Sequence, residues 1–424
     1  MCRSLPFSIS NSAIFNAFYT HMKGLYQQRT GIEHVKPYTN WEYGAHHKGI
    51  YVAHHIPNEN HYSSIYDVET NKPIDFKITQ FDMIKATKTE EFWEDVYGGH
   101  ADAGDYDNRP YHLKIVYGLA AGFLLKKDLM MDNQLNIPES NDGIPDILNE
   151  LEWNLEIHYR AQNRFNNGGV STWIESTSHP SRGDPGNDSQ RYYIGLQTRE
   201  DTLNYAKAAG LLAICFKYCN KCNQKAKEIH FNKWKNSALW AWNFAMNESN
   251  RCEYYFDFNR TINNNLITQH LVYREPDIPD YIYSGAALVI YNLTDCEKIE
   301  CEKFIFKNKK SNVYSEIFTD GIKNIISRIR YPDTIEGFPL CLFIDNPNFE
   351  KAIITMKDSV NNVLVNLWNY QDDATNYTYR NAYFYPANHY YYKSLGWGNF
   401  NGGPHTHTVC VTYYKATPYN ISHT

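Results

Sequence analysis

Apolar residues recur at intervals of three and four along much of this chain of 424 residues, which is the spacing of helices that bury one face. The interval 13–27 is typical, with apolar side chains at Ile14, Phe15, Phe18, Met22 and Leu25. Pro110 and Pro145 open two more runs, 110–127 and 144–164, and proline suits the first turn of a helix. The second run stops before the pair Gly168-Gly169, a typical end signal.

Further helices are predicted along the rest of the chain. Thr198 and Asp201 are spaced to cap one of them. Others are expected at 227–247, 280–293, 313–329, 348–370 and 403–415, which gives about nine helices in all. By contrast, 28–97 is polar, aromatic and interrupted by prolines, so it predicts loops with a few short strands. Hairpins of helices set around a ring account for this pattern, and we expect an all-α fold.

The composition of the chain excludes some classes of binding partner. The net charge is −6, from 41 Lys+Arg against 47 Asp+Glu, and no stretch holds five like charges, which argues against nucleic acid and an anionic membrane. The chain contains no run of 18 apolar residues, the length needed to span a membrane. Its N-terminus does not have the pattern of a signal peptide. Of the 35 tyrosines many must fill the core, but the excess fits a carbohydrate cleft.

Nine scattered cysteines, an odd number, favour reduced thiols in a cytoplasmic protein. Cys219 and Cys222 form a single CxxC with no second pair at the spacing of a zinc site. His405 and His407 lie two positions apart, whereas zinc on a helix favours a spacing of four. We therefore expect neither a metal nor a cofactor.

The most informative segment is 98–107, which reads GGHADAGDYD. Asp102 and Asp105 stand three positions apart among glycines, which keep bulky side chains away and allow sharp turns. Both carboxylates can then hold one water, from which one takes a proton as the base of an inverting glycosidase does. A loop that caps the following helix is the structural alternative. A calcium loop is a third, but 106–109 supplies neither its glycine nor its glutamate.

This segment resembles the DAGD signature of glycoside hydrolase family 9, the cellulase family. The likeness continues at 136–150, which resembles the family's opening of a barrel helix, and at Gly168-Gly169, where the family has a glycine pair before an active-site loop. The stretch 174–180 resembles the subfamily that carries an immunoglobulin-like domain before the barrel. The resemblance runs from about 13 to 416. It implies an (α/α)6 barrel of helical hairpins that hydrolyses β-1,4-glycosidic bonds with inversion.

On this resemblance Asp105 is the general base and Asp102 shares its water, so the two titrate as a coupled pair. The expected substrate-binding residues are Tyr106, Arg109, Trp173, His179 and Arg182. Four of them have a structural alternative: Trp173 can belong to the core, Arg109 to a helix start, and His179 and Arg182 to a surface loop.

The expected partner is an oligosaccharide or polysaccharide. The stretch 396–408 resembles exo-acting enzymes that release β-linked glucosamine from chitosan oligosaccharides, and β-1,4-glucan is the alternative. An amino sugar needs a carboxylate for its ammonium group, and Asp102, Asp107 and Glu175 are the candidates.

The resemblance also predicts a piece of a longer protein. Residues 1–12 resemble the last strand of an immunoglobulin-like domain, and 13–424 the catalytic domain without its last helices. The family's acid is a glutamate near the C-terminus, but the last glutamate here is Glu350. A carbohydrate-binding pseudoenzyme is therefore the main alternative to an enzyme, and a helical scaffold that binds no sugar is a third.

Overall fold

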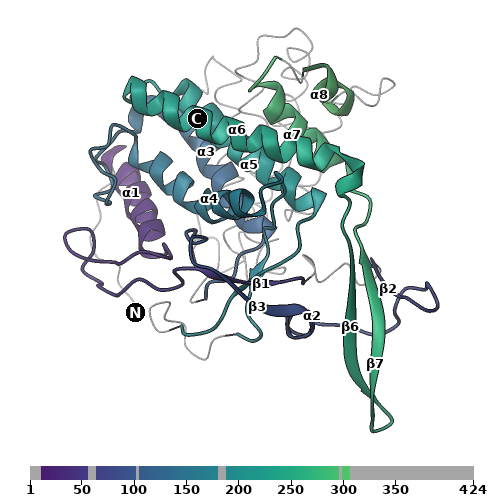
Figure 1. Cartoon of the computed structure of the whole chain (residues 1–424). Coiled ribbons are helices and arrows are strands. Elements are labelled where there is room, and N and C mark those ends of the chain that lie inside the picture. Colours follow the sequence, from purple (N-terminus) through teal and green to yellow (C-terminus); the bar gives the residue numbers. More distant parts are fainter. Residues whose placement is uncertain (1–10, 56–63, 102–104, 180–187, 296–297, 306–424) are drawn as a thin grey trace, which may run out of the picture.

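The computed structural model describes residues 11–55, 64–101, 105–179, 188–295 and 298–305. Its longest helices stack together, and two small sheets lie to one side of them (Figure 1). The helices are α1 (Asn11–Gln27), α2 (Gln80–Thr87), α3 (Lys114–Lys126), α4 (Asp146–Phe165), α5 (Arg199–Tyr218), α6 (Gln224–Met246), α7 (Asp280–Tyr291) and α8 (Lys298–Ile305). The strands are β1 (Ile50–Ala53), β2 (Ile65–Asp67), β3 (Lys88–Trp93), β4 (Ile174–Glu175), β5 (Tyr193–Ile194), β6 (Glu253–Ile262) and β7 (Asn265–Arg274).

The helix α5 lies at the centre of the helical core and contacts α3, α4, α6 and α7. Its side chains are buried almost all round, although one apolar face was the expectation for each helix. Small residues make this possible: a Cβ at Gly210 would lie 2.5 Å from Cγ1 of Val289 in α7, so only glycine permits the close approach. The centre of the molecule is thus a tightly packed helix layer.

Six of the predicted helices fall in the described residues, and all six are confirmed with bounds within a few residues. A short 3-10 helix, Pro110–Leu113, leads into α3, and Thr198 caps α5 by accepting a hydrogen bond from the N–H of Asp201 at 3.1 Å. The sequence did not predict α2 or α8. The predicted helices at 313–329, 348–370 and 403–415 lie outside the described residues.

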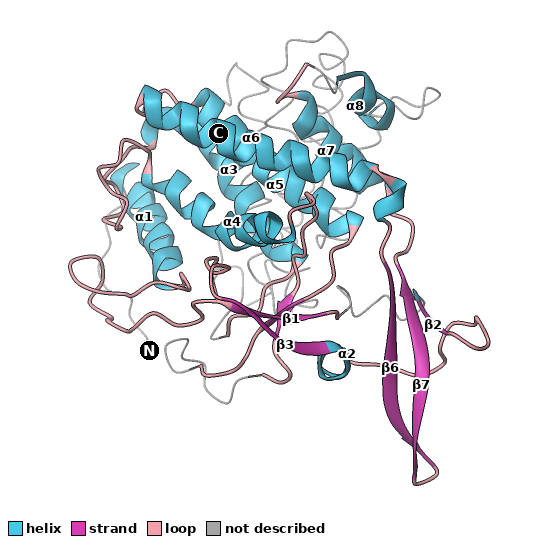
Figure 2. Ribbon diagram, viewed as in Figure 1, coloured by secondary structure: helices cyan, strands magenta, loops and turns pink. Residues whose placement is uncertain are grey.

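The four-stranded sheet has the order β3-β1-β5-β4, and it appears beneath the helices in Figure 2. The strands β1 and β5 run parallel, with Tyr51 opposite Tyr193, whereas the other two pairs are antiparallel. Its inner face carries Ile50, Val52 and Ile194, which pack on Ile157 of α4. The outer face is partly covered by α2. This sheet ties the irregular 28–97 region to the helical body.

The second sheet, β2-β7-β6, is built on a long hairpin that projects from the body (Figure 1). The strands β6 and β7 pair over ten residues each, while β2 supports only Leu271–Tyr273. The turn consists of Asn263 and Asn264, whose φ values of 50° and 64° suit the tight turn of a two-residue hairpin. This hairpin was not predicted.

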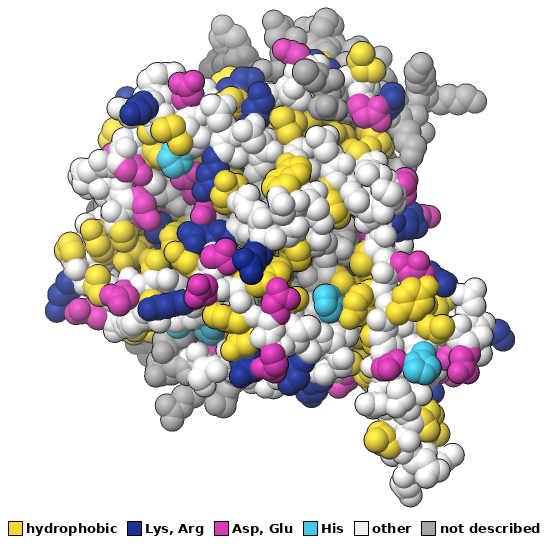
Figure 3. All heavy atoms as spheres, viewed as in Figure 1, with side chains coloured by type: hydrophobic (Ala, Val, Ile, Leu, Met, Phe, Trp, Pro, Cys, Tyr) yellow, Lys and Arg dark blue, Asp and Glu magenta, His cyan; other side chains and the backbone are white. Residues whose placement is uncertain are grey.

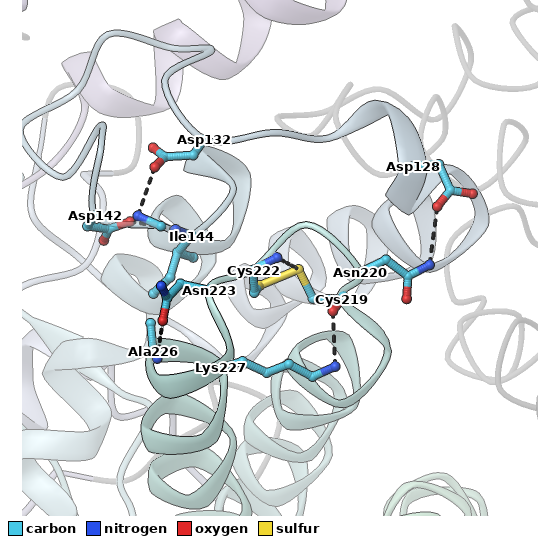
Figure 4. Close-up of a disulfide and its surroundings, with 11 residues drawn as sticks. Asp128, Asp132, Asp142, Ile144, Cys219, Asn220, Cys222, Asn223, Ala226 and Lys227 are labelled. Atoms are coloured by element: carbon cyan, nitrogen blue, oxygen red, sulfur yellow. Dashed lines mark hydrogen bonds between the residues drawn. A yellow bond between two sulfur atoms is a disulfide. The ribbon is translucent and has the colours of Figure 1, made fainter.

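A disulfide joins Cys219, which ends α5, to Cys222, which precedes the N-cap of α6 (Figure 4). The expectation of reduced thiols is wrong for this pair, because the tight α5–α6 turn brings the two Cα atoms to 5.7 Å. Lys227 donates to the Cys219 carbonyl at 3.0 Å, and Asn220 donates to Asp128 at 3.3 Å. The turn is therefore anchored both to α6 and to the segment after α3.

The surface shown in Figure 3 carries basic and acidic side chains interspersed, in keeping with the near balance of charge in the sequence. None of the described helices combines the length and apolar character needed to cross a membrane.

Candidate active site

The segment before the acidic motif is fixed between two helices. The N–H of Gly99 donates to the carbonyl of Trp153 in α4 (2.9 Å), and the N–H of Ala101 donates to the carbonyl of Gln28, next to α1 (2.8 Å). Gly98 and Gly99 adopt φ values of 117° and 81°, which glycine tolerates without steric cost. The glycines of the motif therefore let the chain turn sharply where it meets α4.

A buried charge network lies behind this segment. The Nε of Arg29 donates to Oε2 of Glu150 (3.1 Å), and its Nη1 reaches both carboxylate oxygens of Glu139 (2.9 and 3.0 Å). The Nε2 of His100 contacts the same oxygen of Glu150 at 3.1 Å, and Asn154 contacts its Nδ1 at 3.1 Å. Burial alone raises the pKa of Glu150, but Arg29 and His100 outweigh it and the pKa is lowered. The network holds His100, and with it the motif, against α4.

The segment after Asp105 is fixed to β4. Asn108 and Ile174 exchange both backbone hydrogen bonds, at 2.8 and 2.9 Å. This pairing brings Glu175 beside Arg109, whose Nη2 donates to Oε2 of the glutamate at 2.6 Å. The Nε of the same arginine lies 3.2 Å from Oδ2 of Asp107. One guanidinium thus contacts two carboxylates, and its single positive charge is shared between them.

Glu175 is almost fully buried, and burial raises the pKa of its carboxyl group. The N–H of Ser176 and the guanidinium of Arg109 oppose this effect by hydrogen bonding to the charged form. Because the carboxylate is already paired, it is a support for Arg109 rather than an open group.

Asp105 lies at the solvent-accessible part of this arrangement, with 17% of its side chain exposed. Its Oδ2 is 3.6 Å from Nδ1 of His179, whose side chain is 65% exposed. The imidazole in turn packs edge-on against Phe81 of α2, with ring centroids 5.0 Å apart. The structure thus places Asp105 and His179, both of which the sequence analysis expects at the site, next to each other.

Two predicted substrate-binding residues are buried instead. Tyr106 is 1% exposed, and its hydroxyl donates a hydrogen bond to the Gly98 carbonyl at 2.9 Å. Its ring stacks on that of His47, with the ring centroids 4.7 Å apart. Trp173 is 6% exposed and lies beneath the guanidinium of Arg109, 5.8 Å from the ring centroid. Neither ring offers an open face for a sugar, because both support the residues that surround the motif.

A buried cluster behind the motif was not predicted. Tyr192 donates to Oδ2 of Asp188 at 2.6 Å, and Nε2 of His47 lies 3.6 Å from the same oxygen. Burial lowers the pKa of His47 to about 4, against the charge of Asp188. Burial and the bond to Asp188 raise the pKa of Tyr192, and the nearby charge of Asp105 adds to this. No local pattern relates positions 47 and 188, so sequence reasoning had no signal for this cluster.

The predicted residues Asp102 and Arg182 lie outside the described residues, as do Glu350, His405 and His407. Within the described ranges, no group of three or more His, Cys, Asp or Glu side chains could hold a metal ion.

Comparisons with known proteins show which sequences and folds this chain resembles. No protein-family model matches the chain. A cellulose 1,4-beta-cellobiosidase of Acetivibrio thermocellus is 26% identical over 251 residues, which cover 53% of this chain and 26% of that protein. The chain therefore spans about a quarter of the length of this curated relative.

Two solved structures are similar in fold. A family 9 glycoside hydrolase of Bacteroides ovatus has a TM-score of 0.55 at 17% identity, with 86% of this chain and 59% of that chain covered. The family 9 endoglucanase J30 has a TM-score of 0.58 at 15% identity, with 98% of this chain and 66% of that chain covered. The chain thus has the fold of glycoside hydrolase family 9, an (α/α)6 barrel. This confirms the fold that the motif resemblance implied, to which the structure adds two small sheets.

Proposed function

We propose that this chain, with the fold of family 9 glycoside hydrolases, belongs to an enzyme that cleaves β-1,4-glycosidic bonds of a glucan with inversion, Asp105 acting as general base. One observation carries the proposal. The side chain of Asp105 is 17% exposed, whereas those of the neighbouring carboxylates Asp107 and Glu175 are 6% and 1% exposed and both pair with Arg109. A base must reach a water, and the exposed carboxylate meets that condition.

The residues around Asp105 then have assigned roles. Arg109 holds Asp107 and Glu175, and His179 lies beside the base on the solvent side. In an inverting enzyme the base removes a proton from water while an acid across the bond protonates the leaving oxygen. Asp102 is proposed to share the water with Asp105.

The paired state of the carboxylates favours glucan over an amino sugar. An ammonium group needs an available carboxylate, but Asp107 and Glu175 both contact the guanidinium of Arg109, at 3.2 and 2.6 Å. The relative from Acetivibrio thermocellus is named for cellulose, which agrees with this choice. A chitosan-type substrate remains the second candidate only through Asp102.

The test is Asp105→Asn, assayed by release of reducing ends from soluble β-1,4-glucan. Loss of a general base is expected to lower kcat by about 10² to 10⁴-fold with the fold intact. The matched control is Asp75→Asn, an exposed carboxylate that should leave the rate unchanged. Proton NMR of the first product should show the α-anomer. Full activity of the Asp105 variant or a β-anomer refutes the mechanism.

A further inference from the structure

The turn between α5 and α6 carries the CxxC sequence of Cys219 and Cys222, which takes no part in the function proposed above. Only two residues separate the cysteines, so their disulfide closes a very small loop. A disulfide stabilises a fold less the shorter the loop that it closes. This bond can therefore open while the chain stays folded, which is the first requirement of a reversible redox site.

The two cysteines differ in their access to solvent. Cys219 is the C-cap of α5, belongs to the core and is 2% exposed, whereas Cys222 is half-buried between exposed residues of the turn. Cys222 also lies directly before Asn223, the N-cap of α6. The N-terminus of a helix stabilises negative charge on a nearby sulfur. A thiol from solution thus reaches Cys222 rather than Cys219.

The structure also stabilises a thiolate on Cys219. The backbone N–H of Cys222 donates to Sγ of Cys219 at 3.0 Å. The ammonium group of Lys227 donates to the carbonyl of Cys219 at 3.0 Å, which brings a positive charge to the same residue (Figure 4). The C-terminus of α5 disfavours negative charge there, and these two groups oppose that effect. Cys219 is therefore suited to leave as a thiolate when the disulfide is attacked.

Hydrogen bonds hold the turn independently of the disulfide. The side chain of Asn220 donates to Asp128 at 3.3 Å, and the N–H of Asn223 donates to the carbonyl of Gly143 at 2.7 Å. Together with the bond from Lys227, they fix both ends of the turn. Two thiols that are held close together react with each other far more readily than free ones, so the disulfide can form again.

We propose that Cys219 and Cys222 form a reversible thiol–disulfide exchange site that is reduced by a dithiol. The thiolate of the dithiol attacks Sγ of Cys222, the bond between the two cysteines breaks, and its electron pair leaves on Sγ of Cys219. The second thiol of the reductant then attacks the mixed disulfide and releases Cys222. Two electrons and two protons pass from the dithiol, which becomes a disulfide, to the cysteine pair.

The test treats the folded chain with dithiothreitol, alkylates free thiols with excess N-ethylmaleimide and analyses tryptic peptides by mass spectrometry. Trypsin cleaves after Lys221, between the two cysteines, so the oxidised pair gives two linked peptides and the reduced pair two separately labelled ones. Cys215 of α5 is fully buried and is the internal control, because it should stay unlabelled while the fold is intact. Oxidised glutathione should then restore the linked peptides.

Single variants test which sulfur reacts. Oxidised glutathione should modify Cys222 in the Cys219→Ser chain at least about tenfold faster than Cys219 in the Cys222→Ser chain. The proposal is overturned if the linked peptides persist until Cys215 is labelled, if oxidised glutathione does not restore them, or if the two variants react equally fast. None of these outcomes bears on Asp105 as base, because no step requires a glucan or its hydrolysis.

Discussion

The buried ion pair between Arg29 and Glu150 allows the sharpest test of how the motif is held. Both side chains are fully buried, and Nε and Oε2 lie 3.1 Å apart. At an effective dielectric constant of 20 their attraction is about 5 kcal/mol, and removal of one partner of a buried pair costs about 3–5 kcal/mol because the other charge is left unpaired. We therefore expect Arg29→Met to lower the thermal midpoint by about 6–10 °C, at about 2 °C per kcal/mol for a domain of this size.

The assay is a thermal melt followed by circular dichroism, with Lys36→Met as the matched control. Lys36 forms an ion pair with Glu42 at 3.1 Å, but both side chains are exposed, so its loss should cost no more than about 1 kcal/mol. The double variant Arg29→Met/Glu150→Gln removes the orphaned charge and should recover part of the loss.

The pH dependence of the stability gives a second test. In the unmodified chain the pKa of Glu150 is lowered, so its contribution to stability is present above the ordinary carboxyl pKa and is lost as the pH falls through the folded-state value. In Arg29→Met the buried carboxyl has a raised pKa, and the deficit should be largest near neutral pH and shrink toward about pH 4. A deficit no larger than that of Lys36→Met, or one independent of pH, refutes the assignment of Arg29 as the partner that keeps Glu150 charged.

Three further predictions concern other parts of the fold. Burial raises the pKa of Asp201 well above its usual value, so the folded state becomes less stable as the pH rises above the ordinary carboxyl pKa. Asp201→Asn should therefore raise the thermal midpoint at pH 7 but not below about pH 4. Reduction of the Cys219–Cys222 disulfide, followed by thiol titration and a melt, should cost about 2 kcal/mol, because the closed loop is short. Gly168→Ala should destabilise the chain by more than 1 kcal/mol in the same melt, since φ is +91° and the new Cβ would lie 2.7 Å from the Trp240 carbonyl oxygen.

Each of these has an outcome that contradicts it. A midpoint for Asp201→Asn that falls at pH 7 means that the carboxylate is stabilised in the fold. An unchanged midpoint after complete reduction means that the hydrogen bonds of the α5–α6 turn, such as those of Lys227 and Asn220, hold it without the disulfide. Wild-type stability of Gly168→Ala means that the loop relaxes away from Trp240.

The parts of the fold that could be predicted from the sequence are those determined by residues a few positions apart in the chain. Thr198 and Asp201 are three positions apart, and the structure shows the hydrogen bond that this spacing implies. The β6–β7 hairpin carries a local signal as well, because Asn263-Asn264 has the composition of a two-residue turn, but the strands lack the strict alternation that marks a half-buried strand. It was missed for that reason.

The candidate site depended on pairings that no local pattern encodes. Arg109 and Glu175 are 66 positions apart, and their contact follows from the backbone pairing of Asn108 with Ile174. The motif and the family resemblance led to the prediction of Asp105 and its neighbours as site residues, but neither could show that Tyr106 and Trp173 are buried. That choice is made by the packing of β4 and β5 against the motif.

The parallel pairing of β1 with β5 also determines when the protein can fold during its synthesis. Tyr51 and Tyr193 are 142 positions apart, and at about 5–20 residues per second the ribosome takes roughly 7–28 s to make the intervening chain. Once β3 (Lys88–Trp93) has been made, β1 can pair with this antiparallel neighbour, but its other edge has no partner until β5 follows. The apolar side chains Ile50 and Val52 then lack the cover of Ile157 in α4 and Ile194 in β5 until these elements are made, so the open edge of β1 is a point at which the nascent chain is exposed to aggregation.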